Sequence, residues 1–258
     1  MADYIDIEQA KTLSGLRIVA PPGRPNPWAE GLKSLCHIKR VPYVLVRKVA
    51  GHDPALQGWT LQSSAPVAVW NDERPRTTWN EQLYLLERLV PEPSLVPKDE
   101  EARVLMFGLC NELCGEAGLG WYRRIMIIHS TLSDPEVTEQ GKAAASYLGE
   151  KYGYSPASAE AASQRIGQTL RMLNTRLTAQ QSEGREYFFG NLMSALDIYW
   201  STFAVLLQPM PPELCPMDPA IRDSFVNTDP IVAESLSPEL LAHRDRIYRE
   251  HLQLPMDF

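Results

Sequence analysis

Asn26, at the start of an expected helix, is the polar residue whose position most clearly suggests chemistry. It precedes Pro27 and Trp28, where the pattern predicts a helix over residues 27–38. An amide at a helix N-terminus can donate a hydrogen bond to an anion such as a thiolate, but it cannot act as a nucleophile. The position therefore favours stabilisation of a bound anion over covalent thiol chemistry.

Two further segments offer a backbone edge or a helix end to a ligand. Ala65-Pro66 stands before an expected strand, and a cis peptide bond there would expose a backbone edge, whereas a trans proline beginning the strand is the alternative. Glu81 and Gln82 begin an expected helix over 81–89, and ligand carboxylates favour helix N-termini. Simple helix capping by Glu81 is the alternative explanation for the acid.

The cysteines show no arrangement typical of a catalytic or metal site. The chain has four of them, too few and too scattered for a disulfide framework: Cys36, Cys110, Cys114 and Cys215. Cys110 and Cys114 are four residues apart in an expected helix, but the two further ligands that zinc requires are missing. Buried thiols that pack as small hydrophobic side chains are therefore expected, and no metal site is expected.

Strand and helix patterns alternate through residues 15–90, which contain these segments. Expected strands cover 16–20, 41–46, 66–70 and 76–79, and expected helices cover 27–38, 54–57 and 81–89. The opening strand–helix–strand unit predicts two parallel strands, and the short turn after Trp70 predicts an antiparallel hairpin. The first half is therefore expected to be an α/β domain.

The second half has only helical patterns. Residues 91–97 are rich in proline and predict a semi-rigid linker. Beyond them the expected helices cover 98–131, 135–152, 157–182, 194–208, 218–225 and 238–251. The longest of these is expected to break or bend between Gly115 and Gly120. Residues 98–258 are therefore expected to form an all-helical domain.

Bulk composition is that of an ordinary globular protein, with 44% hydrophobic and 22% charged residues. Disorder is suggested only for the first dozen residues and the short C-terminal tail. The net charge of -7 argues against a broad nucleic-acid-binding surface. The sequence has no long apolar run and no signal-peptide pattern, so we expect a cytoplasmic protein with no membrane or nucleic-acid partner.

One motif in the second half predicts a structural contact. Ser194 and Asp197 have the spacing of a capping box and follow the glycine turn Tyr187-Phe188-Phe189-Gly190-Asn191. Ser194 would accept a hydrogen bond from a free backbone N–H group, and Asp197 would reach back to the start of the helix. Loss of either side chain would cost about 0.5–2 kcal/mol of stability.

This capping box, the element order and the proline-rich linker together resemble the cytosolic glutathione transferases over about residues 16–251. The resemblance implies a thioredoxin-like domain over 15–90, followed by an all-helical bundle over 98–258, and a homodimer. Family members often have Ser-Pro or Cys-Pro where this chain has Asn26-Pro27. The usual catalytic hydroxyl or thiol is therefore replaced by an amide.

The resemblance also implies that reduced glutathione is the cofactor. Asn26 would hold its sulfur as a thiolate, and the residues matched to the rest of its site are Arg24, Trp28, Ala65, Pro66, Glu81 and Gln82. Gln82 replaces the family's serine. The pocket for the second substrate would be bordered by Trp121, Tyr122 and Arg123. A solvated loop charge is the alternative for Arg24, and core packing is the alternative for the three pocket residues.

These matches predict addition of the glutathione thiolate to a small hydrophobic electrophile. A glutathione-dependent lyase or isomerase, in which glutathione attacks the substrate and later leaves, is one alternative. A non-catalytic binding protein with the same fold is another, and the changes at Asn26 and Gln82 favour it.

Overall fold

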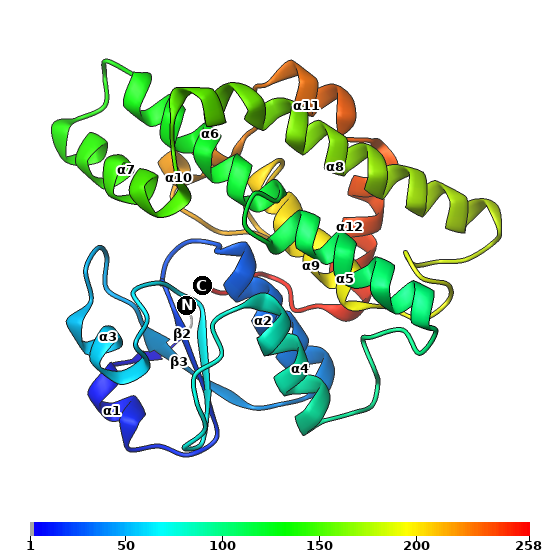
Figure 1. Cartoon of the computed structure of the whole chain (residues 1–258), viewed down its shortest axis with the longest axis horizontal. Coiled ribbons are helices and arrows are strands. Elements are labelled where there is room, and N and C mark those ends of the chain that lie inside the picture. The colour runs from blue at the N-terminus through cyan, green and yellow to red at the C-terminus, as the bar shows by residue number, and fades with distance from the viewer. Residues whose placement is uncertain (1–2) are drawn as a thin grey trace.

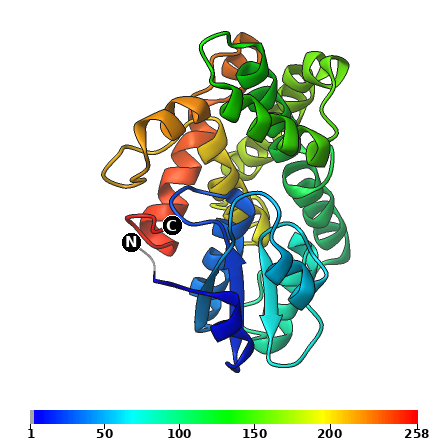
Figure 2. The same ribbon diagram turned by 90° about the vertical axis from the view of Figure 1, so that its left-hand side faces the viewer.

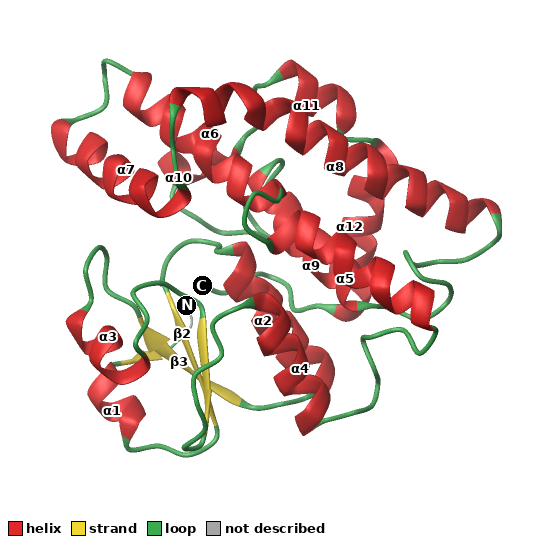
Figure 3. Cartoon of the chain, in the orientation of Figure 1, coloured by secondary structure: helices red, strands yellow, loops and turns green. Residues whose placement is uncertain are grey.

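A computed structural model describes residues 3–258 as a sheet-containing half and a helical half (Figure 1). All the strands lie in the first half, and the second half is built from helices and loops (Figure 3). The expected α/β domain followed by an all-helical domain is confirmed.

The sheet has four strands in the order β1-β3-β2-β4. They are β1 (Tyr4–Ile5), β2 (Leu16–Ala20), β3 (Tyr43–Arg47) and β4 (Val67–Trp70). The expected parallel pairing of β2 with β3 is confirmed, and β4 pairs antiparallel with β2. The predicted strand over 76–79 is wrong: one antiparallel bridge joins Ala68 to Arg76, and Trp79 already begins a helix.

Both faces of the sheet are covered by helices (Figure 1). Successive side chains of a strand point to opposite faces. Ile18 therefore packs with α2 (Pro27–Lys39) and α4 (Trp79–Leu89), while Val19 packs against α1 (Ile7–Lys11) and α3 (Pro54–Thr60). This sheet between two helical layers positions the N-terminus of α2 at one end of β2.

The expected disorder of the first dozen residues is wrong for residues 3–12, and Met1 and Ala2 lie outside the described residues. β1 pairs in parallel with β3, and Asp6 caps α1 by accepting a hydrogen bond from the Gln9 amide at 2.7 Å. Ile7 and Ala10 of α1 are buried against the sheet. A two-residue strand and a five-residue helix are too short to show a recognisable period in the sequence.

The C-terminal tail also packs on the protein rather than being disordered. It returns from α12 (Pro238–His251) toward the α/β half (Figure 2). Met256 and Phe258 are buried, and the Lys33 ammonium lies 5.9 Å from the centre of the Phe258 ring. The tail alternates apolar residues (Leu252, Leu254, Met256 and Phe258) with other residues, but it forms no strand, so only the packing reveals this contact.

The proline-rich linker is fixed to both halves. Leu95 is buried, and its carbonyl accepts a hydrogen bond from the Ala195 amide at 2.8 Å. The buried Lys39 ammonium donates to the Val90 and Pro93 carbonyls, each at 2.8 Å. These contacts hold the linker against the end of α2.

The helical half follows most of the expected pattern. Its helices are α5 (Glu100–Cys114), α6 (Leu119–Ser133), α7 (Glu139–Tyr152), α8 (Pro156–Ser182), α9 (Ala195–Phe203), α10 (Pro219–Phe225), α11 (Pro230–Ser235) and α12. The expected break lies between α5 and α6, and the sequence pattern missed α11. Every residue of α9 is buried, and its Tyr199 shares one core with Leu32 and Leu35 of α2. The core therefore extends through both halves.

Candidate active site

Asn26 caps α2 and keeps a donor group for a ligand. Its Oδ1 accepts hydrogen bonds from the Trp28 and Ala29 amides at 3.2 and 3.4 Å. The side chain is half-buried, and within residues 3–258 no group accepts a hydrogen bond from its Nδ2. The amide therefore places two N–H donors beside the positive end of the α2 dipole.

Trp28 joins the Asn26 loop to the helical half. Its indole nitrogen donates to the Cys114 carbonyl at 2.8 Å, and its ring meets Phe203 edge-on at 4.9 Å. A β-carbon on Gly120 would lie 3.1 Å from Trp28 and 2.4 Å from Phe203, so only glycine allows this close approach. These contacts hold Trp28 between the halves, and its expected contact with glutathione stays a prediction.

The Ala65–Pro66 peptide bond is cis, as expected, and stands directly before β4. Gln82 is buried, and its Nε2 donates to the Pro66 and Arg76 carbonyls at 3.3 and 3.2 Å. Gln82 therefore holds the backbone around the cis proline, so any effect on a ligand would act through that backbone. Ala65 stays half-buried at the edge.

Glu81 belongs to a capping box, as the alternative interpretation of this residue stated. Its Oε2 accepts from the Thr77 and Thr78 amides at 3.1 and 3.2 Å, and its Oε1 pairs with Arg74 at 2.6 Å. Burial raises the pKa of Glu81, but these hydrogen bonds outweigh it and hold the pKa at about 2. The carboxylate is charged at neutral pH, and both of its oxygens already accept hydrogen bonds from residues of this chain.

The predicted pocket residues on α6 separate into two groups. Trp121 donates to the Tyr152 carbonyl at 2.9 Å and packs edge-on against its ring at 4.7 Å, and the half-buried Tyr122 packs with Trp28 in the same aromatic cluster. Arg123 instead points into the helical half. The structure therefore brings Trp121 and Tyr122 to the Trp28 side of α6, but not Arg123.

Arg123 is buried and holds loops of the helical half together. Its guanidinium donates to the Leu206 carbonyl at 2.8 Å and to the Ser224 and Val226 carbonyls at 3.2 Å each. Burial, followed by the charge of Arg124, lowers its pKa to about 10. Arg123 also lines a pocket of about 520 Å³ together with Met126 and Asp229, and its expected contact with the second substrate stays a prediction.

Arg124, the next residue, is rotated by about 100° around the axis of α6. It is half-buried, and its guanidinium lies 5.5 Å from the centre of the Phe225 ring. Its positive charge opposes the rise in pKa that burial causes in Tyr152, at the end of α7. Sequence reasoning missed this residue; the only available signal was its spacing of three from Trp121, which puts both on one helix face.

The capping box of Ser194 and Asp197 is confirmed at the start of α9. Asp197 accepts from the Ser194 amide and hydroxyl, both at 2.8 Å, and from the Phe188 amide at 3.1 Å. His243 of α12, which sequence reasoning missed, supplies a further contact at 2.8 Å. Both side chains of this last pair are buried, so the box also ties α12 to α9.

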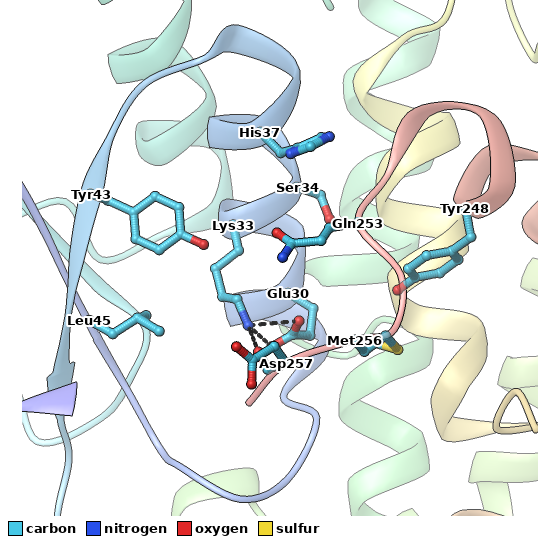
Figure 4. Close-up of a pocket in the computed structure, with 10 residues that line it drawn as sticks. All are labelled: Glu30, Lys33, Ser34, His37, Tyr43, Leu45, Tyr248, Gln253, Met256 and Asp257. Carbon is cyan, nitrogen blue, oxygen red and sulfur yellow. Dashed lines mark hydrogen bonds and ion pairs between the residues drawn. The ribbon is translucent and has the colours of Figure 1, made fainter. Parts of the chain in front are cut away.

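A separate pocket of about 100 Å³ lies beneath the C-terminal tail (Figure 4). Glu30 and Lys33 form an ion pair at 3.0 Å inside it, and Lys33 also donates to the Asp257 carbonyl. Burial raises the pKa of Glu30, while Lys33 opposes that shift. None of the site residues predicted from the sequence is among the described residues that line this pocket.

Among the residues that the structure describes, no group of three or more His, Cys, Asp or Glu side chains could hold a metal ion. All four cysteines are buried free thiols, as expected. No helix in residues 3–258 is both long and apolar enough to cross a membrane.

Comparison with known proteins gives matches at the level of structure. A scan against protein-family models finds no match, and neither does a search of curated proteins. A glutathione transferase from Methylobacillus flagellatus with bound glutathione is 15% identical, with a TM-score of 0.62 over 91% of this chain and 95% of that one.

Two other solved structures that resemble this chain carry different names. A β-etherase from Sphingobium is 18% identical, with a TM-score of 0.57 over 91% of this chain and 95% of that one. Maleyl pyruvate isomerase, a bacterial zeta-class protein, is 15% identical, with a TM-score of 0.51 over 88% of this chain and 95% of that one. The chain therefore has the fold of the glutathione transferase superfamily, a thioredoxin-like domain followed by an all-helical domain.

Proposed function

We propose that this chain is a glutathione-dependent transferase that adds the glutathione thiolate to a small electrophile. The observation that carries the proposal is that the oxygen and the nitrogen of the Asn26 side chain have separate roles. Its oxygen caps α2, and its Nδ2 donors face no acceptor in the described residues. The cis Ala65–Pro66 bond, which would expose a backbone edge for the cysteinyl part of glutathione, adds support.

The proposed reaction needs a thiolate at neutral pH. A free thiol has a pKa of about 8.5, and a helix N-terminus with one added donor can lower it toward neutrality. In our proposal the α2 dipole and the Asn26 amide perform this task. The thiolate then attacks the electrophilic carbon, so that a C–S bond forms and the leaving group departs with its electron pair. No protein nucleophile takes part.

Binding of the cofactor is tested directly by titration calorimetry with reduced glutathione. We expect a saturable heat at millimolar ligand or below, and weaker binding of a methylated glutathione that lacks the thiol. The absence of any heat at millimolar ligand would exclude both enzyme proposals. It would leave a non-catalytic binding protein as the remaining function.

Lyase or isomerase chemistry is the second candidate. Its support is the structural similarity to proteins named as a β-etherase and an isomerase. In those reactions a glutathione adduct forms and glutathione can be released or consumed, depending on the step. Mass spectrometry of turnover mixtures distinguishes the candidates: conjugation consumes glutathione one for one with product, whereas an isomerase returns it unchanged.

We further propose a homodimer in the cytoplasm. An exposed apolar patch on α4 and α5 supports the dimer: Tyr84 and Val104 are 55% and 70% exposed, and Tyr84 stacks on Phe107 at 5.3 Å. Exposed apolar patches of this kind often mark contacts between proteins. Light scattering of the parent and of Val104→Glu tests it, since a charge on the patch should shift a dimer toward monomer.

A further inference from the structure

The loop that carries Asn26 holds one of four cationic side chains whose charges act on one another in pairs: Arg24 with Arg124, Arg124 with Lys151, and Lys151 with Lys48. Arg24 lies in this loop, Lys48 follows β3, Arg124 lies on α6, and Lys151 lies near the end of α7. Figure 1 shows the loops after β2 and β3 directed toward α6 and α7. The charges therefore meet where the two halves face each other.

Aromatic contacts fix the two cations of the helical half. The Arg124 guanidinium lies 5.5 Å from the Phe225 ring centre, and its charge opposes the rise in pKa that burial causes in Tyr152. The Lys151 ammonium lies 5.1 Å from the centre of the Tyr152 ring. Tyr152 belongs to the same aromatic cluster as Trp28, two residues after Asn26. The positions of these two cations are thus tied to the candidate active site.

The four cations act on one another as neighbouring like charges. Burial and then Arg24 lower the pKa of Arg124, against the favourable effect of Tyr152. Partial desolvation and then Arg124 lower the pKa of Lys151, although this side chain is exposed. Burial and Lys151 lower the pKa of Lys48, while Asp53 raises it. An anion placed among these groups would relieve their repulsion.

No carboxylate in the described part of the chain neutralises this cluster by a salt bridge. The nearest acidic influence on Lys48 is Asp53, which is buried and caps α3 by accepting from the Leu56 amide at 3.0 Å. The Lys48 ammonium itself donates to the Val49 and Gly51 carbonyls at 2.8 and 3.0 Å. The cluster therefore retains its positive charge for a ligand.

Resting on the proposed function, we propose that the second substrate is an organic anion, an electrophile with a carboxylate group bound by Arg124 and Lys151. Both cations stand on the helical half, where the second substrate of the proposed reaction would lie. Arg24, in the Asn26 loop, adds positive potential between that carboxylate and the sulfur. The apolar body of the electrophile would face Trp121 and Tyr122.

A matched pair of probes tests the charge preference: a chloronitrobenzoate, and the methyl ester of the same acid. In each, the glutathione thiolate attacks the carbon that bears chlorine, a C–S bond forms, the C–Cl bond breaks, and chloride leaves. The two probes differ in the negative charge and in one methyl group. We expect the parent protein to have a higher kcat/KM for the acid than for the ester, relative to the uncatalysed rates.

Arg124→Gln and Lys151→Gln are the test variants, and Lys142→Gln, near the other end of α7, is the matched control. Charge-assisted hydrogen bonds are strong enough that each test variant should lower kcat/KM for the acid by about 10- to 100-fold. The ester should change little. Lys142→Gln should behave as the parent with both probes. Equal effects on acid and ester would overturn the proposal.

Glutathione also carries carboxylates, so its dissociation constant is measured by calorimetry for every variant. Unchanged glutathione affinity with selective loss of the acid supports the proposal, whereas weakened glutathione binding would assign the cations to the cofactor and overturn it. If neither probe reacts, the affinities of the glutathione-loaded protein for unreactive nitrobenzoate and for its carboxamide are compared instead. Equal affinities would refute an anion site, while failure of glutathione itself to bind would refute the proposed function instead. Thermal unfolding of each variant verifies that it folds.

Discussion

Asn26 separates two tasks that a serine hydroxyl would combine in one atom. A serine at a helix N-terminus can accept the capping hydrogen bond and donate its single proton through the same oxygen. In Asn26 the oxygen receives both capping bonds, and the nitrogen carries the donors. An amide therefore keeps the helix cap that a hydroxyl would provide. The donor role of Asn26 can be tested with substitutions that leave this cap in place.

Our proposal predicts that aspartate at position 26 weakens the glutathione thiolate, whereas serine does not. Asn26→Asp keeps a capping oxygen but replaces the donor by a negative charge, so the thiol pKa of bound glutathione should rise. Each unit of that rise corresponds to about 1.36 kcal/mol and lowers the thiolate fraction about tenfold at a pH below the pKa. Asn26→Ser should stay close to the parent. Ultraviolet titration of the bound thiolate measures the shift.

The four cysteines should be chemically silent in the folded protein. Burial raises the pKa of Cys36, Cys110 and Cys114 and brings that of Cys215 to about 12. The thiolate is the reactive form of cysteine, so a disulfide reagent should find no thiol under native conditions. The same reagent in denaturant should titrate all four. Fast labelling of the native protein would contradict the burial seen here.

The neighbours Arg123 and Arg124 show the limit of prediction at this scale. The sequence indicated a helix here and placed Trp121, Tyr122 and Arg123 beside the substrate. Successive residues of a helix are rotated by about 100°, so three consecutive residues cannot all face one pocket. Which of them does is decided by how α6 packs, and that packing turns Arg123 inward and Arg124 toward Tyr152.

At the scale of elements, local end signals predicted most of the helices. Pro27, Pro54 and Pro238 each stand at the first residue of a helix, and Ser194 caps α9, because capping depends only on neighbouring residues. Thr77 and Thr78 led to the wrong prediction of a strand, because threonine is common in strands as well as at helix caps. Here Thr78 caps α4, so the expected strand over 76–79 was replaced by the start of a helix.

The Glu81 capping box should make the stability of α4 depend on pH. Hydrogen bonds lower the folded-state pKa of Glu81 to about 2, below its ordinary value of 4.5, so its stabilising effect is complete above the unfolded pKa. That effect is lost as the pH falls from about 4.5 toward 2. Glu81→Gln should cost about 0.5–2 kcal/mol at neutral pH and almost nothing near the lower limit. Urea unfolding across this range measures the difference.

The control for Glu81 is Glu101→Gln, which removes an exposed carboxylate from the first turn of α5. Its free energy of unfolding should change by no more than about 0.5 kcal/mol at either pH. A cost for Glu81→Gln that stayed constant down to the acid limit would show that the carboxylate charge does not carry the capping effect. In that case the side-chain length alone would be responsible.

For the whole molecule, one core through both halves links the candidate site to global stability. Leu32 and Leu35 of α2 and Tyr199 of α9 belong to the same buried cluster. Lys39 fixes the linker, and Trp28 of α2 packs against the helical half. The sequence predicted two domains but not this shared core, because side-chain complementarity between distant segments has no local pattern. We therefore expect the halves to unfold together.

Gly120→Ala tests whether this interface positions the site. The added β-carbon would lie 2.4 Å from Phe203 and 3.1 Å from Trp28, so Trp28 or α6 has to move. Such overpacking costs about 1–3 kcal/mol, and a displaced Trp28 shifts Asn26, so both stability and glutathione affinity should fall. Gly108→Ala, on an exposed face of α5 with no atom within 4 Å, should instead stabilise the helix by about 1 kcal/mol. Urea unfolding and calorimetry on both variants measure these effects. If Gly120→Ala lost stability but kept its glutathione affinity, the interface would not position the site.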